Sequence, residues 1–334
     1  MARPSPWHDQ WVEEQRPGTP DCGSAAKHRA LVYRDADRFV DAVGAFVRDG
    51  VERRECVLAA LSAEKLDWLR DDLGADAPAV DFADERSLYK RHGPMLASVL
   101  DYLERHGTPG GGRVRIVAEQ ALALRDPADV RAYMRYEAAS NVAYARFDAT
   151  VLCPYDAARL PDAIVRDALR THPEVLDEGA PRPSERYVDP RSFVRERAVV
   201  GPVPAGVTPI ALELPDDVAG ARAFARAHAE AAGAPTEAIE DLELAISEVA
   251  TNALVHGRGP RLVWCYVDHG DLVCRVHDAG PGPADPLQGY LPPDIRRLRG
   301  RGLWLAHQLC DIVEIAGDRA GTDVELRLKV GRAA

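Results

Sequence analysis

A carboxylate and an amide stand four residues apart within 239–257, where apolar residues recur at three- and four-residue steps. That period predicts an α-helix, so Glu248 and Asn252 share one face about one turn apart. A polar pair on an apolar, alanine-rich helix is costly unless something uses it. The alternative is a core helix with a polar stripe at its edge, with Thr236 as N-cap and Gly257 as its C′ residue.

Two glycine-containing segments further along could complete a binding site. Asp278-x-Gly280-x-Gly282 ends a predicted strand, and Gly300-x-Gly302 opens a predicted helix. Glycine lets the backbone approach a ligand closely, and the free N–H groups at a helix N-terminus bind phosphate. Each segment alone is weak evidence, because Asp-x-Gly-x-Gly is also an everyday turn.

The second half of the chain alternates strands and helices around these segments. Strands are predicted at 208–214, 261–267, 271–277, 312–316 and 322–330, and helices at 216–232 and 303–310, besides the one at 239–257. Asp268-His269-Gly270 predicts a tight hairpin turn. The last strand alternates apolar and charged residues, which indicates a half-buried antiparallel strand.

The first half predicts a doubly wound α/β domain, because strands and helices alternate regularly. Strands are predicted at 30–33, 55–61, 79–82, 114–118 and 149–153, and helices at 37–48 (ended by Gly50), 63–73, 94–105 and 129–145. The segment after the first strand lacks the G-x-x-x-x-G-K-[ST] pattern, so no phosphate loop is expected there.

Composition narrows the classes of protein. The chain has 334 residues, which favours two domains, and a formal charge of −11, which disfavours direct nucleic-acid binding. The start lacks a signal-peptide core and no segment resembles a membrane span, so we expect a cytoplasmic protein without membrane contact. The six cysteines include no C-x-x-C pair, so neither a disulfide framework nor a zinc motif is suggested.

The three pieces, in this order and spacing, resemble the GHKL ATPase superfamily. The phrases Glu-Val-Ala-Thr-Asn-Ala-Leu-Val-His-Gly and Gly-Arg-Gly-Leu-Trp-Leu are most similar to its anti-sigma-factor serine kinase group. The resemblance covers about 206–330 and implies a two-layer α/β (Bergerat) ATPase domain that binds ATP and Mg²⁺. Residues 284–299 would then form the lid over ATP.

The resemblance gives each residue a role. Asn252 would hold Mg²⁺ through its amide oxygen, and Glu248 would be the catalytic base. Asp278 would accept a hydrogen bond from the adenine amine. The remaining cofactor-binding residues would be Gly280, Gly282, Gly300, Arg301, Gly302 and Thr322. For Arg301 a solvated surface role stays open, for Thr322 an ordinary strand start, and for His256 a packing role is preferred.

The first half resembles the MEDS sensory domain over about 27–192. The phrases are His28 before the first strand, Cys153-Pro154-Tyr155-Asp156, Leu160-Pro161, Thr171-His172-Pro173 and Tyr187-Val188-Asp189-Pro190. The family implies a degenerate RecA-like fold and an input role. His28, His92, Cys153 and His172 are candidates for a ligand or metal, against ordinary capping and packing.

These observations predict a flexible tail (1–26), a sensory domain (27–192), a linker (193–206) and an ATPase domain (207–334). The expected function is an ATP-dependent serine/threonine kinase that phosphorylates an anti-anti-sigma (STAS-type) partner and binds a sigma factor in its other state. The resemblance leaves a homodimer open as its assembly. The alternatives are a sensor histidine kinase, with His228 as phosphoacceptor, and a sigma-factor binder gated by ATP without phosphotransfer.

Overall fold

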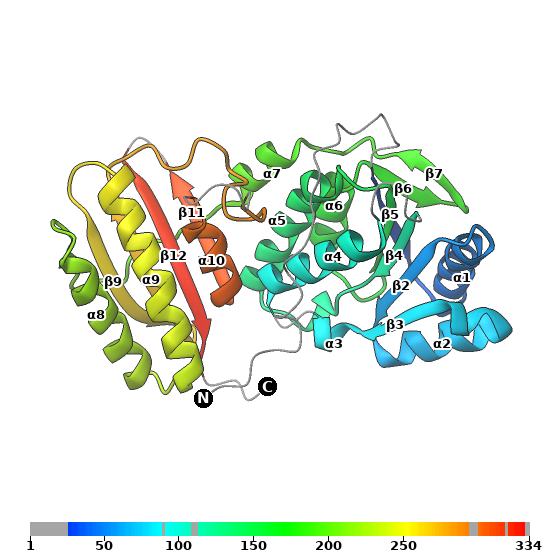
Figure 1. Ribbon diagram of the computed structural model, residues 1–334, viewed down its shortest axis with the longest axis horizontal. Coiled ribbons are helices and arrows are strands. Elements are labelled where there is room, and N and C mark those ends of the chain that lie inside the picture. The colour runs from blue at the N-terminus through cyan, green and yellow to red at the C-terminus, as the bar shows by residue number, and fades with distance from the viewer. Residues whose placement is uncertain (1–25, 89–90, 108–112, 294–299, 318–319, 331–334) are drawn as a thin grey trace.

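The computed structural model describes residues 26–88, 91–107, 113–293, 300–317 and 320–330. Two sheets dominate it and lie in two bodies, one from each half of the chain (Figure 1). The predicted tail therefore lies almost entirely outside the described residues, as does the second part of the predicted lid, 294–299.

The first body contains a seven-stranded sheet. Its elements are β1 (Lys27–Tyr33), α1 (Ala36–Glu52), β2 (Cys56–Leu61), α2 (Ala63–Leu73), β3 (Val80–Asp84), α3 (Glu85–Leu88), α4 (His92–His106), β4 (Val114–Ala118), α5 (Pro127–Tyr144), β5 (Ala149–Asp156), α6 (Asp162–Thr171), β6 (Glu174–Asp177), β7 (Ala180–Pro183) and α7 (Pro190–Arg197), with short 3₁₀ turns at Gly74–Ala79 and Leu122–Leu124. The strand order is β3-β2-β4-β5-β1-β6-β7, with β7 antiparallel and the other neighbours parallel.

Helices cover both faces of this sheet. One core joins α1 and α2 to strand residues such as Leu31 and Val57, and the other joins α4, α5 and α7 to strand residues such as Ala30 and Leu58. Neighbouring strand residues point to opposite faces, so Ala30 and Leu31 belong to different cores. The predicted doubly wound α/β fold is confirmed.

Helix α5 is the most enclosed element of the first body. Every residue from 132 to 140 is buried, including Arg135 and Glu137. A helix that buries polar residues on all sides must satisfy them with specific partners. Both of these residues are considered below.

The second body is a five-stranded sheet covered on one face by helices. Its elements are β8 (Ile210–Ala211), α8 (Asp217–Ala231), α9 (Thr236–His256), β9 (Leu262–Asp268), β10 (Asp271–Asp278), α10 (Gly302–Leu309), β11 (Ile312–Gly317) and β12 (Thr322–Lys329). The order is β11-β12-β10-β9-β8, antiparallel throughout. One core joins α8, α9 and α10 to this sheet, which confirms the predicted two-layer architecture.

The hairpin between β9 and β10 forms as predicted. His269 and Gly270 both have positive φ, 49° and 88°. Two such residues in a two-residue loop give the turn whose twist matches that of the flanking strands. The hairpin places Asp278 at the end of β10, level with Thr322 on β12.

Several local predictions were wrong. Gly50 does not end the first helix; it lies inside α1, where a Cβ would meet the side chains of Val57 and Arg115 at 2.8–2.9 Å. Pro235, not Thr236, is the N-cap residue of α9. Gly257 follows the helix in an extended conformation, with φ −72° and ψ 172°. The strand expected at 208–214 shortens to β8.

The last part of the first body contains more structure than the sequence indicated. Elements α6, β6, β7 and α7 have no predicted counterpart. Helix α7 extends five residues into the predicted linker, and its Phe193 and Val194 are buried in the core of the first body. Asp189 caps this helix, because its Oδ1 accepts a hydrogen bond from Ser192 N at 3.0 Å. Pro190 fits the first turn, where no backbone N–H is needed.

Candidate functional site

The polar pair of α9 lies against the start of α10. A Cβ built on Gly302 would lie 2.6 Å from Glu248 Oε2 and 3.2 Å from Asn252 Nδ2. Glycine permits this approach without displacing the Glu248 carboxylate, which a Cβ at this position would push aside. The structure therefore brings together two of the three pieces that the sequence singled out.

The third piece joins them through Asp278. Its Oδ1 atom accepts hydrogen bonds from Gly280 N (2.6 Å) and from Arg258 N (3.3 Å). A Cβ on Gly257 would lie 2.5 Å from Asp278 Cγ, so the end of α9 packs directly on this carboxylate. The extended glycine is thus explained by close packing and not by a left-handed cap.

Thr322 fixes the loop that follows Asp278. Its buried hydroxyl donates to the carbonyl oxygen of Gly280 at 2.8 Å. Gly282 has φ +72°, and a Cβ there would lie 2.8 Å from Thr322 Oγ1. Thr322 therefore holds the glycine loop in place in addition to being the first residue of its strand.

Gly300 and Arg301 lead into α10. Gly300 is exposed with φ +93°, and no atom lies within 4 Å of where its Cβ would be. Arg301 occupies the N-cap position with an exposed side chain. The first N–H groups of α10 consequently follow an open glycine turn beside Glu248 and Asn252.

Two family models match successive parts of the chain. Residues 27–173 match MEDS, the methanogen/methylotroph DcmR sensory domain, and residues 212–328 match the histidine kinase-like ATPase domain. The chain carries a MEDS domain followed by a histidine kinase-like ATPase domain. The resemblances drawn from the sequence are confirmed at this level.

Individual relatives are more distant. An anti-sigma F factor from Clostridium novyi is 29% identical over 105 residues, which is 28% of this chain and 73% of the relative. Among solved structures, the RsbU and RsbW domains of a Mycobacterium tuberculosis protein are 24% identical over 40% of this chain and 34% of theirs, with a TM-score of 0.30. The histidine kinase domain of a blue-light activated histidine kinase from Erythrobacter litoralis is 16% identical over 52% of this chain and 77% of its own, with a TM-score of 0.26.

An ATPase domain of this family implies ATP, usually with Mg²⁺, and the site residues fit that ligand. An amide and a carboxylate offer the hard oxygen atoms that Mg²⁺ prefers. The glycines leave backbone exposed where side chains would otherwise fill the space. The residues that the resemblance assigns to ATP binding are referred to below as the ATP-site residues: Glu248, Asn252, Asp278, Gly280, Gly282, Gly300, Arg301, Gly302 and Thr322.

Two histidines of the ATPase domain lie outside this group. His256 is exposed at the last position of α9. His228 on α8 is half-buried, and its Nδ1 lies 2.9 Å from the carbonyl oxygen of Phe224, one turn earlier, whose ring it also contacts. Both therefore have ordinary helix-end or packing environments.

The predicted lid is anchored on the MEDS domain. Leu287 and Tyr290 are 1% and 5% exposed, and they belong to the core that α4, α5 and α7 form. Tyr290 Oη accepts a hydrogen bond from Arg135 Nε on α5 at 2.8 Å. The described part of the lid is thus held by side chains of the other domain.

The same arginine forms a buried ion pair with the ATPase domain. Arg135 Nη1 lies 2.7 Å from the carboxylate of Glu314 on β11, and both residues are buried. Its guanidinium also donates to the carbonyl oxygens of Val313 and Arg197 at 3.2 Å. Burial raises the pKa of Glu314, while the charge of Arg135 opposes that rise.

Helix α10 packs against α4 and α5 (Figure 1). The Tyr136 hydroxyl lies 2.7 Å from His307 Nδ1, and a Cβ on Gly93 would overlap the carbonyl oxygen of His307. Burial, with a smaller contribution from the charge of Arg135, lowers the pKa of His307 to about 3. The imidazole is therefore neutral, and its Nδ1 shares a hydrogen bond with the tyrosine hydroxyl.

A second charged contact reaches α9 itself. Arg91, at the start of α4, lies 2.9 Å from Asp241 on α9 and 3.5 Å from Asp311, which follows α10. Asp241 is two helical turns before Glu248, on the same helix.

The residues described above that join the two domains are named the domain contact: Arg91, Gly93, Arg135, Tyr136, Asp241, Tyr290, His307, Asp311 and Glu314.

Of the four ligand candidates in the MEDS domain, three converge. His28, Cys153 and His172 surround Glu137, whereas His92 lies apart and pairs with Asp129 at 3.0 Å. The sequence did not indicate Glu137. A glutamate inside a helical pattern resembles a surface residue until tertiary contacts are known.

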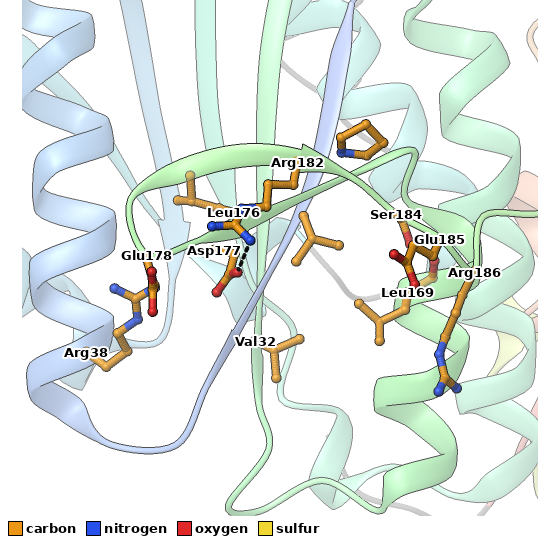
Figure 2. Close-up of a pocket in the computed structure, with 12 residues that line it drawn as sticks. Val32, Arg38, Leu169, Leu176, Asp177, Glu178, Arg182, Ser184, Glu185 and Arg186 are labelled. Atoms are coloured by element: carbon orange, nitrogen blue, oxygen red, sulfur yellow. Dashed lines mark hydrogen bonds and ion pairs between the residues drawn. The ribbon is translucent and has the colours of Figure 1, made fainter.

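A separate cleft lies at the edge of the first sheet, between α1 and the β6–β7 hairpin (Figure 2). Charged side chains are prominent in it, and Asp177 and Arg182 form an ion pair at 3.4 Å. These residues share no member with the ATP-site residues. In the described part of the chain, no helix combines the length and hydropathy needed to cross a membrane.

Proposed function

We propose that this chain is a regulatory protein kinase of the anti-sigma type. Its ATPase domain would bind ATP with Mg²⁺ and phosphorylate a serine or threonine of an anti-anti-sigma partner, and in its other state bind a sigma factor. The observation that carries the proposal is the contact of Glu248 and Asn252 with Gly302, the first residue of α10. The similarity to a relative named as an anti-sigma F factor supports the class of partner.

Each site residue has a distinct task in this proposal. ATP supplies the γ-phosphoryl group. Glu248 would accept the proton of the partner's hydroxyl while the hydroxyl oxygen bonds to the γ-phosphorus, the bond to the β-phosphate breaks and ADP leaves. Asn252 would hold Mg²⁺ through its amide oxygen. The N–H groups that open α10 bind the phosphates, aided by the charge of Arg301. Asp278 accepts from the adenine amine, within a loop that Thr322 secures.

The MEDS domain would regulate the kinase through the lid. Leu287 and Tyr290 are held by the MEDS core, so the lid position depends on how the two domains are docked. Arg91 ties the same domain to α9, which carries the proposed base. A change in the MEDS domain that releases Arg135 would therefore alter lid closure over ATP.

A histidine kinase is the less favoured function. His228 is the candidate phosphoacceptor, but it lies on α8 inside the ATPase domain, with its ring against Phe224. A non-catalytic binder would not need Glu248 beside Asn252. These alternatives give different products: phosphohistidine is acid-labile, phosphoserine is acid-stable, and a binder forms neither.

The test is phosphotransfer by the full chain and by Glu248→Gln. Partners are first captured with the purified chain in ATP and in ADP, and captured STAS-type proteins are then incubated with radiolabelled ATP. We expect the variant to lose about 10²–10⁴-fold in rate, the usual contribution of general base catalysis, with ATP affinity unchanged. Glu240→Gln, an exposed substitution on the same helix, is the matched control.

Three outcomes would count against the proposal. Undiminished phosphotransfer by Glu248→Gln would remove Glu248 from the mechanism. Label that is lost in acid would favour histidine phosphorylation. Sigma-factor capture that depends on ATP, with no labelled product from any captured protein, would favour the non-catalytic binder.

A further inference from the structure

Four potential metal ligands meet inside the MEDS domain. They come from four elements: His28 from β1, Glu137 from α5, Cys153 from β5, and His172 from the residue that follows α6. All four are at least 92% buried, and His172 is fully buried. They play no part in the proposed phosphotransfer.

The ligand atoms are close enough for a single ion. His28 Nε2 lies 3.3 Å from Cys153 Sγ and 3.3 Å from Glu137 Oε2, and His172 Nε2 lies 3.2 Å from the same carboxylate oxygen. All of the ligand atoms fall within 4.8 Å of one another. In a tetrahedral zinc site, bond lengths of about 2.0–2.3 Å place ligands roughly 3.3–3.8 Å apart. The widest separation needs only a modest contraction.

Hydrogen bonds orient both imidazoles toward the centre of the cluster. His28 Nδ1 lies 3.1 Å from Asn141 Oδ1, and the Asn141 amide nitrogen donates to backbone carbonyls, including that of Thr171, so the oxygen is the acceptor. His172 Nδ1 lies 2.8 Å from the carbonyl oxygen of Ala168. Each Nδ1 therefore donates its proton outward, which leaves the Nε2 lone pair pointing inward.

This orientation leaves buried polar atoms without suitable partners. Glu137 Oε2 and His172 Nε2 face each other, yet among the described residues neither makes a hydrogen bond of good geometry. Two acceptors at this distance repel unless a proton or a cation lies between them. As carboxylate and thiolate, Glu137 and Cys153 would supply two negative charges, which one divalent ion neutralises.

We propose that His28, Glu137, Cys153 and His172 bind one Zn²⁺ ion. Two imidazole nitrogens, one thiolate and one carboxylate form a complete tetrahedral set for zinc, and the thiolate disfavours Mg²⁺ or Ca²⁺. The cavity beside the cluster, lined by residues such as Met95 and Val99, holds only about 20 Å³. That volume accommodates roughly one water, so an organic ligand does not fit this conformation.

The experiment measures metal in the full chain, produced with zinc in the medium and purified without chelators. Elemental analysis should find about one zinc per chain in the unchanged protein. Glu137→Gln, nearly identical in shape, should lower zinc content at least tenfold, as should Cys153→Ser. Cys310→Ser replaces an equally buried cysteine of the ATPase domain and should leave the content unchanged.

Cobalt substitution provides a readout that a merely structural role would not move. Refolding or exchange with Co²⁺ should give the visible bands of tetrahedral cobalt and a thiolate charge-transfer band. In Cys153→Ser the visible bands should weaken along with the metal content, and cobalt that is forced in by excess Co²⁺ should lack the charge-transfer band. Zinc content near background in the unchanged chain would overturn the proposal and favour a proton shared by Glu137 and the histidines. Equal zinc content in Glu137→Gln, Cys153→Ser and the unchanged chain would also overturn it, and circular dichroism checks that each variant is folded.

Discussion

The ATP-site residues and the domain contact are built from opposite kinds of residue. The ATP site consists largely of glycines and half-exposed polar side chains on loops and helix ends. The centre of the domain contact, formed by Arg135, Tyr136, Tyr290, His307 and Glu314, is almost wholly buried. A ligand site must stay open, so few of its side chains contact one another. A contact between domains must instead provide a partner for each charge that it buries.

This difference also determines in which region a substitution destabilises the folded protein. Removing a side chain from the domain contact leaves a buried partner unsatisfied, whereas a change in the ATP site affects a ligand. The predictions below separate these effects, beginning with the largest.

Arg135→Ala should have the largest effect on domain docking. Removing one partner of a buried ion pair costs about 3–5 kcal/mol, because Glu314 is left buried without its partner. Hydrogen exchange of 287–293 should accelerate accordingly, since Tyr290 loses its donor. The control is Arg191→Ala at an exposed pair with Asp285, worth about 0–1 kcal/mol. Equal effects of the two variants would mean that burial does not govern the contact.

Gly93→Ala should push α10 away from α4. Its Cβ would overlap the backbone carbonyl of His307, and overpacking of this kind costs about 1–3 kcal/mol. Gly220→Ala should instead stabilise the protein. Gly220 is exposed in α8 with open space around it, so alanine should stabilise the helix by about 1 kcal/mol. Thermal unfolding measures the stability of both variants. An undiminished stability of Gly93→Ala would contradict the prediction, because it would mean that α10 can shift relative to α4 at no cost.

Acidification should weaken the domain contact through His307. Its pKa is about 3 in the folded protein, and about 6.5 when unfolded. Between these values the unfolded state binds more protons, so stability rises with pH and is lost as pH falls from 6.5 toward 3, at about 1.4 kcal/mol per unit.

The variant His307→Asn isolates this contribution. Asparagine can still hydrogen-bond with Tyr136, but it does not titrate. Urea unfolding at pH 7 and pH 5 should show about 2 kcal/mol less acid sensitivity in the variant than in the unchanged chain. His92 and His172, whose pKa values burial also lowers, remain in both proteins. Identical pH dependence would contradict a neutral buried His307.

The smallest expected effect is in the ATP site. Asp278→Asn keeps an oxygen to accept from Gly280 N but loses the charge, so ATP affinity should fall about tenfold, on the order of 1.5 kcal/mol. Discrimination against GTP, which lacks the adenine amine, should fall by the same factor. Competition with a fluorescent ATP analogue measures both, and unchanged discrimination would place adenine recognition elsewhere.

The sequence predicted that Glu248 and Asn252 share a helical face, and the structure brings both to Gly302. Glu248 and Asn252 share a helical face by period alone, and glycines at fixed offsets mark close backbone approach. The same local rules failed at Gly50, because a glycine that ends one helix can elsewhere serve close packing inside another. Helix α7 was missed because its short capped turn gives little periodic signal.

The buried clusters could not be predicted from sequence in the same way. His28 and Cys153 become neighbours only because β1 pairs with β5, and Arg135 meets Glu314 only because two domains dock. Nothing in the local sequence specifies either pairing. Local patterns report on single elements, and long-range pairing follows from how the elements pack.

The position of α5 has one further consequence. Arg135 and Tyr136, which contact the ATPase domain, and Glu137, which lies in the histidine–cysteine cluster, are consecutive residues. At about 1.5 Å of rise per residue, these groups are within one turn of each other. A helix packed on every side moves as a rigid body, since no face can yield alone. Communication between the cluster and the lid therefore needs no long pathway. A small shift of α5 moves Glu137 in the cluster and Arg135 at the lid together.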